Sequence, residues 1–244
     1  MDELPLSLKE AIYSFIIAVT VRNLRGDQFE HKTMLIHATR LKDLQNRLRD
    51  LVSDFIDEIY AAFAVSQLDK PNEHFEKLRD VFSKSYSNIP EKWEKLAPDL
   101  GSTASILKNH VYGINGDNKD VIDEEQYPNG LNSIRIGGDK LSRGLTLPGL
   151  MTSYFLRVSR MYDTLMQMGR WFGYRSNYED LCHLYTTAKL YNWFSHVANA
   201  SENLRMRIFG TRILGLIRMA VSESDSVGYG INMGRRGTVY RAYI

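Results

Sequence analysis

The sequence lacks several features that would assign it to whole classes of protein. It holds one cysteine, Cys182, in 244 residues, so no disulfide can form within the chain, as is typical of a reducing cytoplasm. The apolar run AIYSFIIAV at residues 11–19 is too short to span a bilayer and predicts a buried helix, with no membrane partner. The net charge of +2 is close to zero, so bulk charge does not require a nucleic-acid partner.

Two further absences concern catalysis. No Gly-x-x-x-x-Gly-Lys-[Ser/Thr] phosphate-binding loop occurs in the chain. The six histidines are scattered without a metal-binding spacing, and we expect no metal site. The densest acidic group has no following strand that carries a lysine, as metal-dependent nucleases require, and we interpret it as a solvated loop; its members are Asp120, Asp123, Glu124 and Glu125.

The chain does contain short apolar segments that alternate with longer amphipathic ones. Apolar patterning predicts strands at residues 32–39, 110–116, 131–138, 151–159 and 180–187. It predicts helices at 5–22, 42–63, after Pro71, at 160–172 and over 188–220, with a loop and short helical pieces over 88–105. Strands that alternate with helices indicate an α/β fold in which a parallel sheet is flanked by helices.

Two of the predicted helices carry local signals. Ser7 and Glu10 have the spacing of a capping box at the start of the first helix. The helix over 42–63 has an apolar face that we expect to be buried, formed by Leu44, Leu48, Leu51, Val52, Phe55 and Ile59. We divide the chain into an N-terminal helical extension at 1–30, a main α/β unit at 31–187 and C-terminal helices with a tail at 188–244.

The stretch GGDKLSRGLTL, residues 137–147, directly follows a predicted strand. Its glycines allow close approach of the backbone to another group, and Ser142 and Arg143 offer donors suited to phosphate. Loops after parallel strands are where α/β proteins place their sites. A tight connection to the next element, with Arg143 in a salt bridge, is an equally good interpretation of this stretch alone.

A second stretch, QMGRWFGYR at residues 167–175, places Gln167, Arg170 and Arg175 around two glycines. Arginines flanked by glycines are suited to phosphate contact. The alternative is a helix that ends at Gly173, with the arginines near the negative end of its dipole and the aromatic residues packed in the core.

The order of these stretches, after the strand end LIHATR at residues 35–40, resembles motifs IV, V and VI of the second RecA-like lobe of superfamily-two helicases. The longer segments resemble one family more closely, the Z-one (Z1) domain of proposed endonucleases in bacterial restriction–modification gene clusters. The resemblance covers roughly residues 30–210 and is carried by GGDKLSRGLTLPGL, SYFLRVSRMYDTLMQMGRWFGYR and YEDLCHLY.

The resemblance implies roles for individual residues. Arg170 and Arg175 would be arginine fingers that stabilise charge on a transferring phosphoryl group, and Gln167 would position the nucleotide. Residues of motif V would face the nucleotide, namely Gly138, Ser142, Arg143, Gly144 and Thr146, the last standing where that motif usually has an aspartate. Contacts to a DNA backbone would come from His37, Thr39, Arg40 and Arg157.

The same resemblance implies ATP with Mg²⁺ as cofactor and DNA as partner. Because the chain has no phosphate-binding loop, the phosphate cradle and the metal ligands are expected on a first RecA-like lobe outside this sequence. Other restriction–modification subunits are further expected partners. Two alternatives remain open, namely an endonuclease domain that acts directly on DNA and a non-catalytic RecA-like scaffold that binds DNA or protein.

Overall fold

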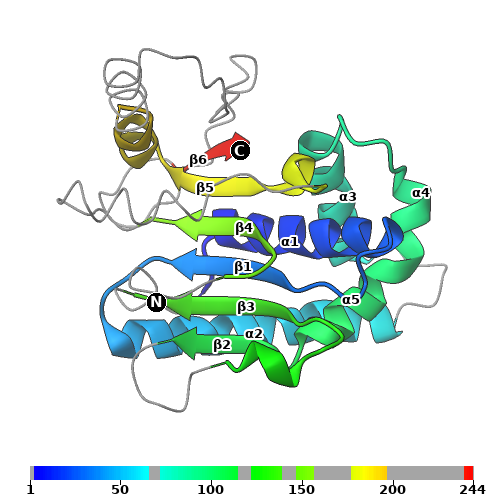
Figure 1. The fold of residues 1–244 in the computed structure, drawn as a ribbon, viewed down its shortest axis with the longest axis horizontal. Helices are drawn as coiled ribbons and strands as arrows, with labels where there is room; N and C mark the ends of the chain where they lie inside the picture. The colour runs from blue at the N-terminus through cyan, green and yellow to red at the C-terminus, as the bar shows by residue number, and fades with distance from the viewer. Residues whose placement is uncertain are drawn as a thin grey trace.

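The fold is a layered α/β arrangement built on one six-stranded sheet (Figure 1). The computed structural model describes residues 3–65, 72–114, 122–138, 147–156, 177–196 and 239–243. The strands run in the order β2-β3-β1-β4-β5-β6, the first five parallel and β6 antiparallel to β5. Their bounds are β1 Lys32–His37, β2 Val111–Ile114, β3 Asn132–Gly137, β4 Leu150–Phe155, β5 His183–Thr187 and β6 Val239–Tyr243.

Among the described elements, one helix precedes β1 and the other four numbered helices lie between β1 and β2. They are α1 Leu6–Leu24, α2 Lys42–Val65, α3 Glu73–Ser85, α4 Trp93–Leu96 and α5 Leu100–Leu107, with 3₁₀ turns η1 Ala97–Asp99, η3 Glu124–Gln126 and η5 Glu179–Leu181. Residues 188–196 are also helical. The predicted α/β class is therefore confirmed, and the parallel sheet is consistent with a RecA-like arrangement. The predicted helix at 160–172 lies outside the described residues.

One face of the sheet, the helix face, packs against α1, α2 and α5. Every residue of α1 from Ala11 to Arg22 is buried, because α3 and α5 cover its outer side. This complete burial within the protein explains why the run AIYSFIIAV is apolar, so no bilayer is needed to account for it. No helix within the described ranges is long and apolar enough to cross a membrane.

The capping box predicted at the start of α1 is wrong. Pro5 precedes the helix, and no side chain caps it. Ser7 lies inside the first turn, and its hydroxyl forms a 2.9 Å hydrogen bond with the hydroxyl of Tyr154 on β4. A buried tertiary partner has therefore replaced the local capping interaction that the spacing suggested.

The opposite face of the sheet carries a second apolar cluster, in which the helical residues 188–196 contribute Leu190 and Phe194. The strands contribute Leu35, Phe155 and Leu184. Cys182, expected inside the protein, is buried, and its thiol lies 3.4 Å from the carbonyl oxygen of Tyr178. Apolar side chains thus cover the helix face of the sheet and, on the opposite face, the region around β1, β4 and β5.

The connections define one switch point. From β1 the chain crosses past β3 to β2, on one side of β1 in the sheet. From β4 it continues to β5, in the opposite direction along the sheet. The carboxyl ends of the neighbours β1 and β4 therefore meet where the direction of connection reverses. In open α/β sheets, ligands bind at such points.

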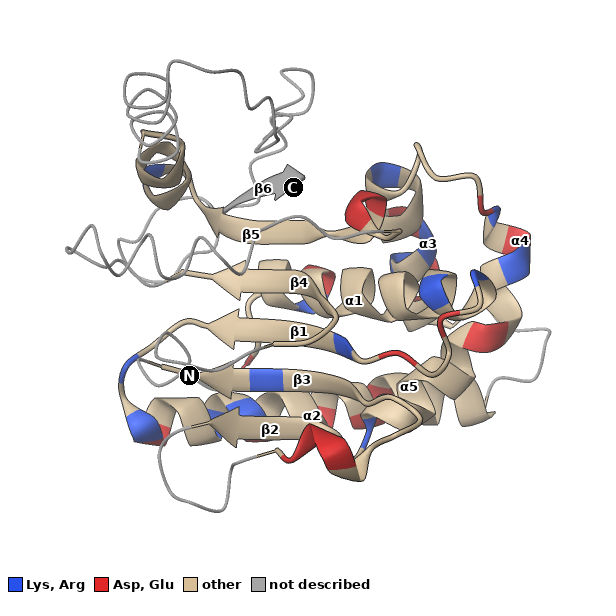
Figure 2. Ribbon diagram, viewed as in Figure 1, with Lys and Arg blue, Asp and Glu red and all other residues tan. Residues whose placement is uncertain are grey.

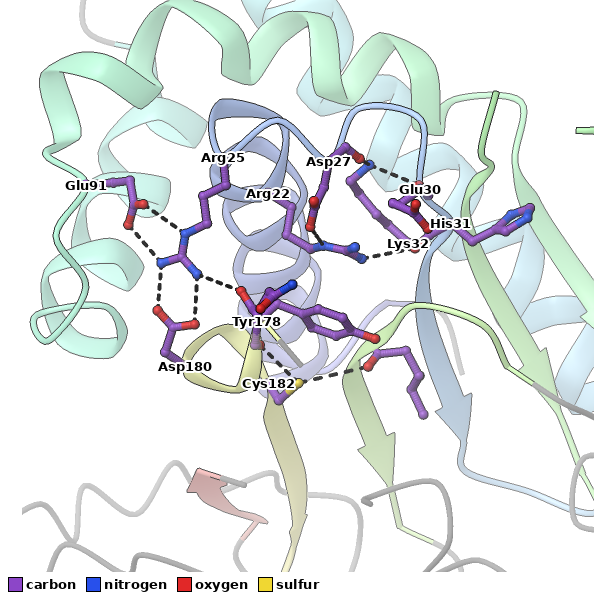
Figure 3. A network of polar contacts seen from close by, with 12 residues as sticks. Arg22, Arg25, Asp27, Glu30, His31, Lys32, Glu91, Tyr178, Asp180 and Cys182 are labelled. Carbon is purple, nitrogen blue, oxygen red and sulfur yellow. Dashed lines mark hydrogen bonds and ion pairs between the residues drawn. The ribbon is translucent and has the colours of Figure 1, made fainter. Parts of the chain in front are cut away.

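A polar network joins elements at the amino ends of the strands, on the far side from this switch point (Figure 3). Arg25, directly after α1, binds two carboxylates at once, Glu91 through 2.8 and 3.0 Å contacts and Asp180 through 2.9 and 2.6 Å contacts. These two acids lie before α4 and in η5, respectively. One guanidinium thus ties three distant segments together, and we call this set the Arg25 clamp.

Two further cations complete the network. Arg22 donates to Asp27 and to the carbonyl of His31, and its guanidinium lies 4.1 Å from the ring centre of Tyr178. Lys32, fully buried at the start of β1, donates to the carbonyl oxygens of Asp27 and Glu30. Burial, with a contribution from the charge of Arg22, lowers the pKa of Lys32 to about 8.

We predict that Arg25→Ala lowers the free energy of unfolding by about 1–3 kcal/mol, because two neighbouring carboxylates lose their shared counter-charge. Urea denaturation measures this loss. The matched control is Arg49→Ala, which removes an exposed pair with the adjacent Asp50 and should change stability by less than about 0.5 kcal/mol.

The clamp also predicts a pH dependence. The hydrogen bonds from Arg25 lower the pKa of Glu91 below 4.5. The stabilisation from the Arg25–Glu91 ion pair is therefore complete at pH values above the ordinary pKa of a glutamate. It is lost as the pH falls through the lowered pKa of Glu91. Equal acid sensitivity of the wild type and Arg25→Ala would contradict this assignment.

Candidate functional site at the carboxyl edge of the sheet

The carboxyl ends of β1 and β4 are joined at the switch point. His37, the last residue of β1, is fully buried, and its ring stacks on Phe155 at 4.8 Å with an interplanar angle of 11°. The amide of Leu156 donates to the carbonyl of His37 at 3.1 Å. The two strand ends are thus fixed relative to each other, and so are the residues that follow β1.

The turn after β1 leads directly into α2. Thr39 is half-buried, and its hydroxyl accepts a hydrogen bond from the amide of Leu41 at 3.2 Å. Arg40 is exposed between them, next to the amino terminus of a 24-residue helix. A helix amino terminus and an arginine both favour an anion, so this turn offers two compatible groups for a phosphate.

The turn after β3 approaches the turn after β1 very closely. A Cβ atom at Gly138 would lie 2.6 Å from the side-chain nitrogen of Gln45 and 3.3 Å from the carbonyl oxygen of Thr39. A larger residue at this position would have to displace the end of the Gln45 side chain, so the glycine allows the two turns to approach closely. The contact brings the residues predicted for motif IV and the first residue predicted for motif V to one place.

Gln45 is a residue of this site that the sequence analysis missed. It is 3% exposed on the first turn of α2, and its amide donates to the Thr39 carbonyl at 2.9 Å. Leu44, which we predicted on the buried face, is 40% exposed. The sequence did contain a signal for the burial of Gln45. Gln45 lies three residues before Leu48, and Leu48 lies four residues before Val52, which is the spacing of the buried helix face.

The structure therefore gathers part of the predicted set. Thr39, Arg40 and Gly138 lie together at the carboxyl edge, and His37 supports them from within through Phe155. The remaining predicted residues lie outside the described ranges: Ser142, Arg143, Gly144, Thr146, Arg157, Gln167, Arg170 and Arg175.

A second polar cluster lies on the sheet face opposite α2. Arg135 gives β3 its only basic segment in Figure 2 and is 1% exposed. It donates to Glu124 at 2.8 Å and to the hydroxyl of Ser133 at 3.2 Å. Tyr112 sits beside it in register on β2, and burial, with a hydrogen bond to Tyr127, raises the pKa of Tyr112 to about 12.

This cluster changes the interpretation of the acidic loop. The sequence analysis predicted that Glu124 is a solvated acid. Instead it neutralises a buried arginine, Arg135. Asp123 accepts from the Glu125 amide and from the Gln126 side chain. Within the described ranges no group of three or more His, Cys, Asp or Glu side chains could hold a metal ion.

The fold and this edge define an α/β domain with a mostly parallel sheet and a candidate functional site beside its switch point. Comparison with known proteins gives a more specific assignment. A family model described as the Z1 domain matches residues 7–217. The chain belongs to the Z1 domain family. No curated protein and no solved structure matches it.

We predict that Glu124→Gln lowers the free energy of unfolding by about 1–3 kcal/mol, because Arg135 would remain buried without a counter-charge. Glu125→Gln is the matched control, since Glu125 is exposed and adjacent, and its effect should stay below about 0.5 kcal/mol. Chemical denaturation of both variants decides between them. Equal effects would show that Glu124 is only a solvated acid.

Proposed function

We propose that this chain is the second RecA-like lobe of an ATP-dependent DNA translocase or helicase-like protein that acts in a restriction–modification endonuclease system. In this function the turns at the carboxyl edge contact the DNA backbone and the nucleotide. Arg170 and Arg175 supply positive charge to the transferring phosphoryl group, and Gln167 positions the nucleotide.

One observation carries the proposal. Thr39, from the segment that resembles motif IV, lies against Gly138, from the segment that resembles motif V, beside the switch point of the sheet. Arg40 is the next residue after Thr39 and is exposed. These segments are about a hundred residues apart in sequence. Membership of the Z1 family supports the proposal but does not by itself specify a helicase lobe.

The residues of this chain suit phosphate rather than a metal ion. Arginine, hydroxyl and backbone amide groups are phosphate donors, whereas Mg²⁺ takes carboxylate oxygens and water. The Mg²⁺ ligands and the phosphate cradle are therefore assigned to a first lobe outside this sequence. Bound ATP would supply the phosphoryl group, and Ser142, Arg143, Gly144 and Thr146 would face it from this lobe.

The alternative of a nuclease centre within this chain has less support. Of its candidate acids, Glu124 is engaged by Arg135 and Asp123 holds η3, so two of the four already have structural roles. The alternative of a non-catalytic scaffold is separated from a motor lobe by the arginine substitutions described below.

For DNA contact we predict that Arg40→Ala weakens binding of this chain to any duplex and reduces the slope of log K against log salt by about one. Fluorescence anisotropy of a labelled oligonucleotide at several salt concentrations measures both quantities. The matched control is Arg79→Ala on α3, an exposed arginine away from the carboxyl edge (Figure 1), which should change neither. An unchanged slope in Arg40→Ala would contradict the phosphate contact.

For phosphoryl transfer we predict that Arg170→Ala or Arg175→Ala lowers DNA-stimulated ATP hydrolysis by about three to five orders of magnitude. The measurement uses the assembly that contains both lobes, with nucleotide binding followed separately. Loss of turnover with binding retained identifies the finger. Unchanged turnover in both variants would favour the non-catalytic scaffold.

A further inference from the structure

Gln45 lies between the two turns of the carboxyl-edge site. Its side-chain amide donates to the carbonyl of Thr39 at 2.9 Å, and its backbone amide donates to the carbonyl of Leu41 at 3.0 Å. Arg40 lies between these two residues in sequence. The side chain of Gln45 therefore holds the backbone directly before the exposed arginine, whereas the bond to Leu41 is the ordinary backbone bond of the first helical turn.

The same amide faces the turn after β3. The position of a Cβ at Gly138 lies 2.6 Å from the Gln45 nitrogen, which is closer than side chains approach one another in folded proteins. Gln45 is 3% exposed, so its amide has little room to move away. The Gln45 amide thus occupies the space that a side chain at position 138 would need.

A buried glutamine in an otherwise apolar stripe is costly unless its polar atoms are used. The neighbouring buried residues of α2 are apolar, among them Leu48 and Val52. A leucine would fill the position without a desolvation cost but could not bind the Thr39 carbonyl. The fold therefore keeps a polar group where packing alone favours an apolar one.

We propose that Gln45 is the positioning residue of the carboxyl-edge site, tying the turn after β1 to the turn after β3 so that Arg40 meets a DNA phosphate in a fixed place. The DNA part of this inference rests on the proposed function. The contact between Gln45 and Gly138 stands on the geometry alone, and the two parts are tested separately.

The contact is tested by a double-mutant cycle read by thermal unfolding of the full chain. Gly138→Ala should lower Tm by about 3–8 °C in the wild type, because the new methyl group displaces the Gln45 amide. In a Gln45→Ala background the same substitution should lower Tm by less than about 2 °C, because the methyl group then has space. Equal shifts in the two backgrounds would overturn the contact.

The positioning role is tested with Gln45→Met, which keeps the side-chain length but removes the amide. Binding of a labelled duplex should weaken about three- to tenfold, and the salt slope should fall by about one although no charge has been removed. In an Arg40→Ala background, Gln45→Met should add no further loss, because Arg40 is then already absent. The matched control is Gln126→Ala, an exposed glutamine of η3 that bonds Asp123.

The outcomes separate the two claims. Additive losses from Gln45→Met and Arg40→Ala, or an unchanged salt slope in Gln45→Met, would overturn the positioning role while leaving DNA binding in place. No salt-dependent binding by the wild-type chain would overturn the DNA contact itself, whereas the thermal cycle would still decide the fit between Gln45 and Gly138.

Discussion

The pairing of β1 with β3 on one side and with β4 on the other is the constraint on which the site depends. Because all three strands are parallel, their carboxyl ends meet at one edge, and the residues that follow each strand meet there too. The stack of His37 on Phe155 fixes one pair of ends. The close approach of Gly138 to Thr39 fixes the other. A slip of one residue in either register would bring different side chains to the edge and separate these contacts.

Charged residues are arranged differently at the amino ends and at the carboxyl ends of the strands. At the amino edge, Arg25, Arg22 and Lys32 donate to nearby carboxylates and carbonyl groups, and this network holds α1, the segment before α4 and η5 together. At the carboxyl edge, Arg40 is left exposed beside a helix amino terminus. Charge is thus used for cohesion at one edge and is available to an anion at the other, which agrees with the placement of sites in open α/β sheets.

Much of the fold could be predicted from sequence, because apolar periodicity reports burial directly. This pattern predicted a strand at residues 32–39, which the structure ends at His37, and a helix that begins near Lys42. Two errors concern polar residues whose partners lie elsewhere in the fold. Ser7 bonds Tyr154 instead of capping its helix, and Glu124 pairs with Arg135 instead of facing water. Local patterns contain no information about such tertiary partners. The burial of Gln45 in place of Leu44 is different, because its partner, the Thr39 carbonyl, is near in sequence and its spacing with Leu48 and Val52 matches the buried face.

The proposed function requires that nucleic acid binds this chain at the carboxyl edge. Photo-crosslinking of a DNA oligonucleotide to the full chain, followed by mass-spectrometric mapping of the modified peptides, tests it most directly. We expect crosslinks in the segment that contains Thr39 and Arg40, and unlabelled competitor DNA or added salt should reduce them. Crosslinks confined to α3 or to the amino edge around Arg25 would contradict it.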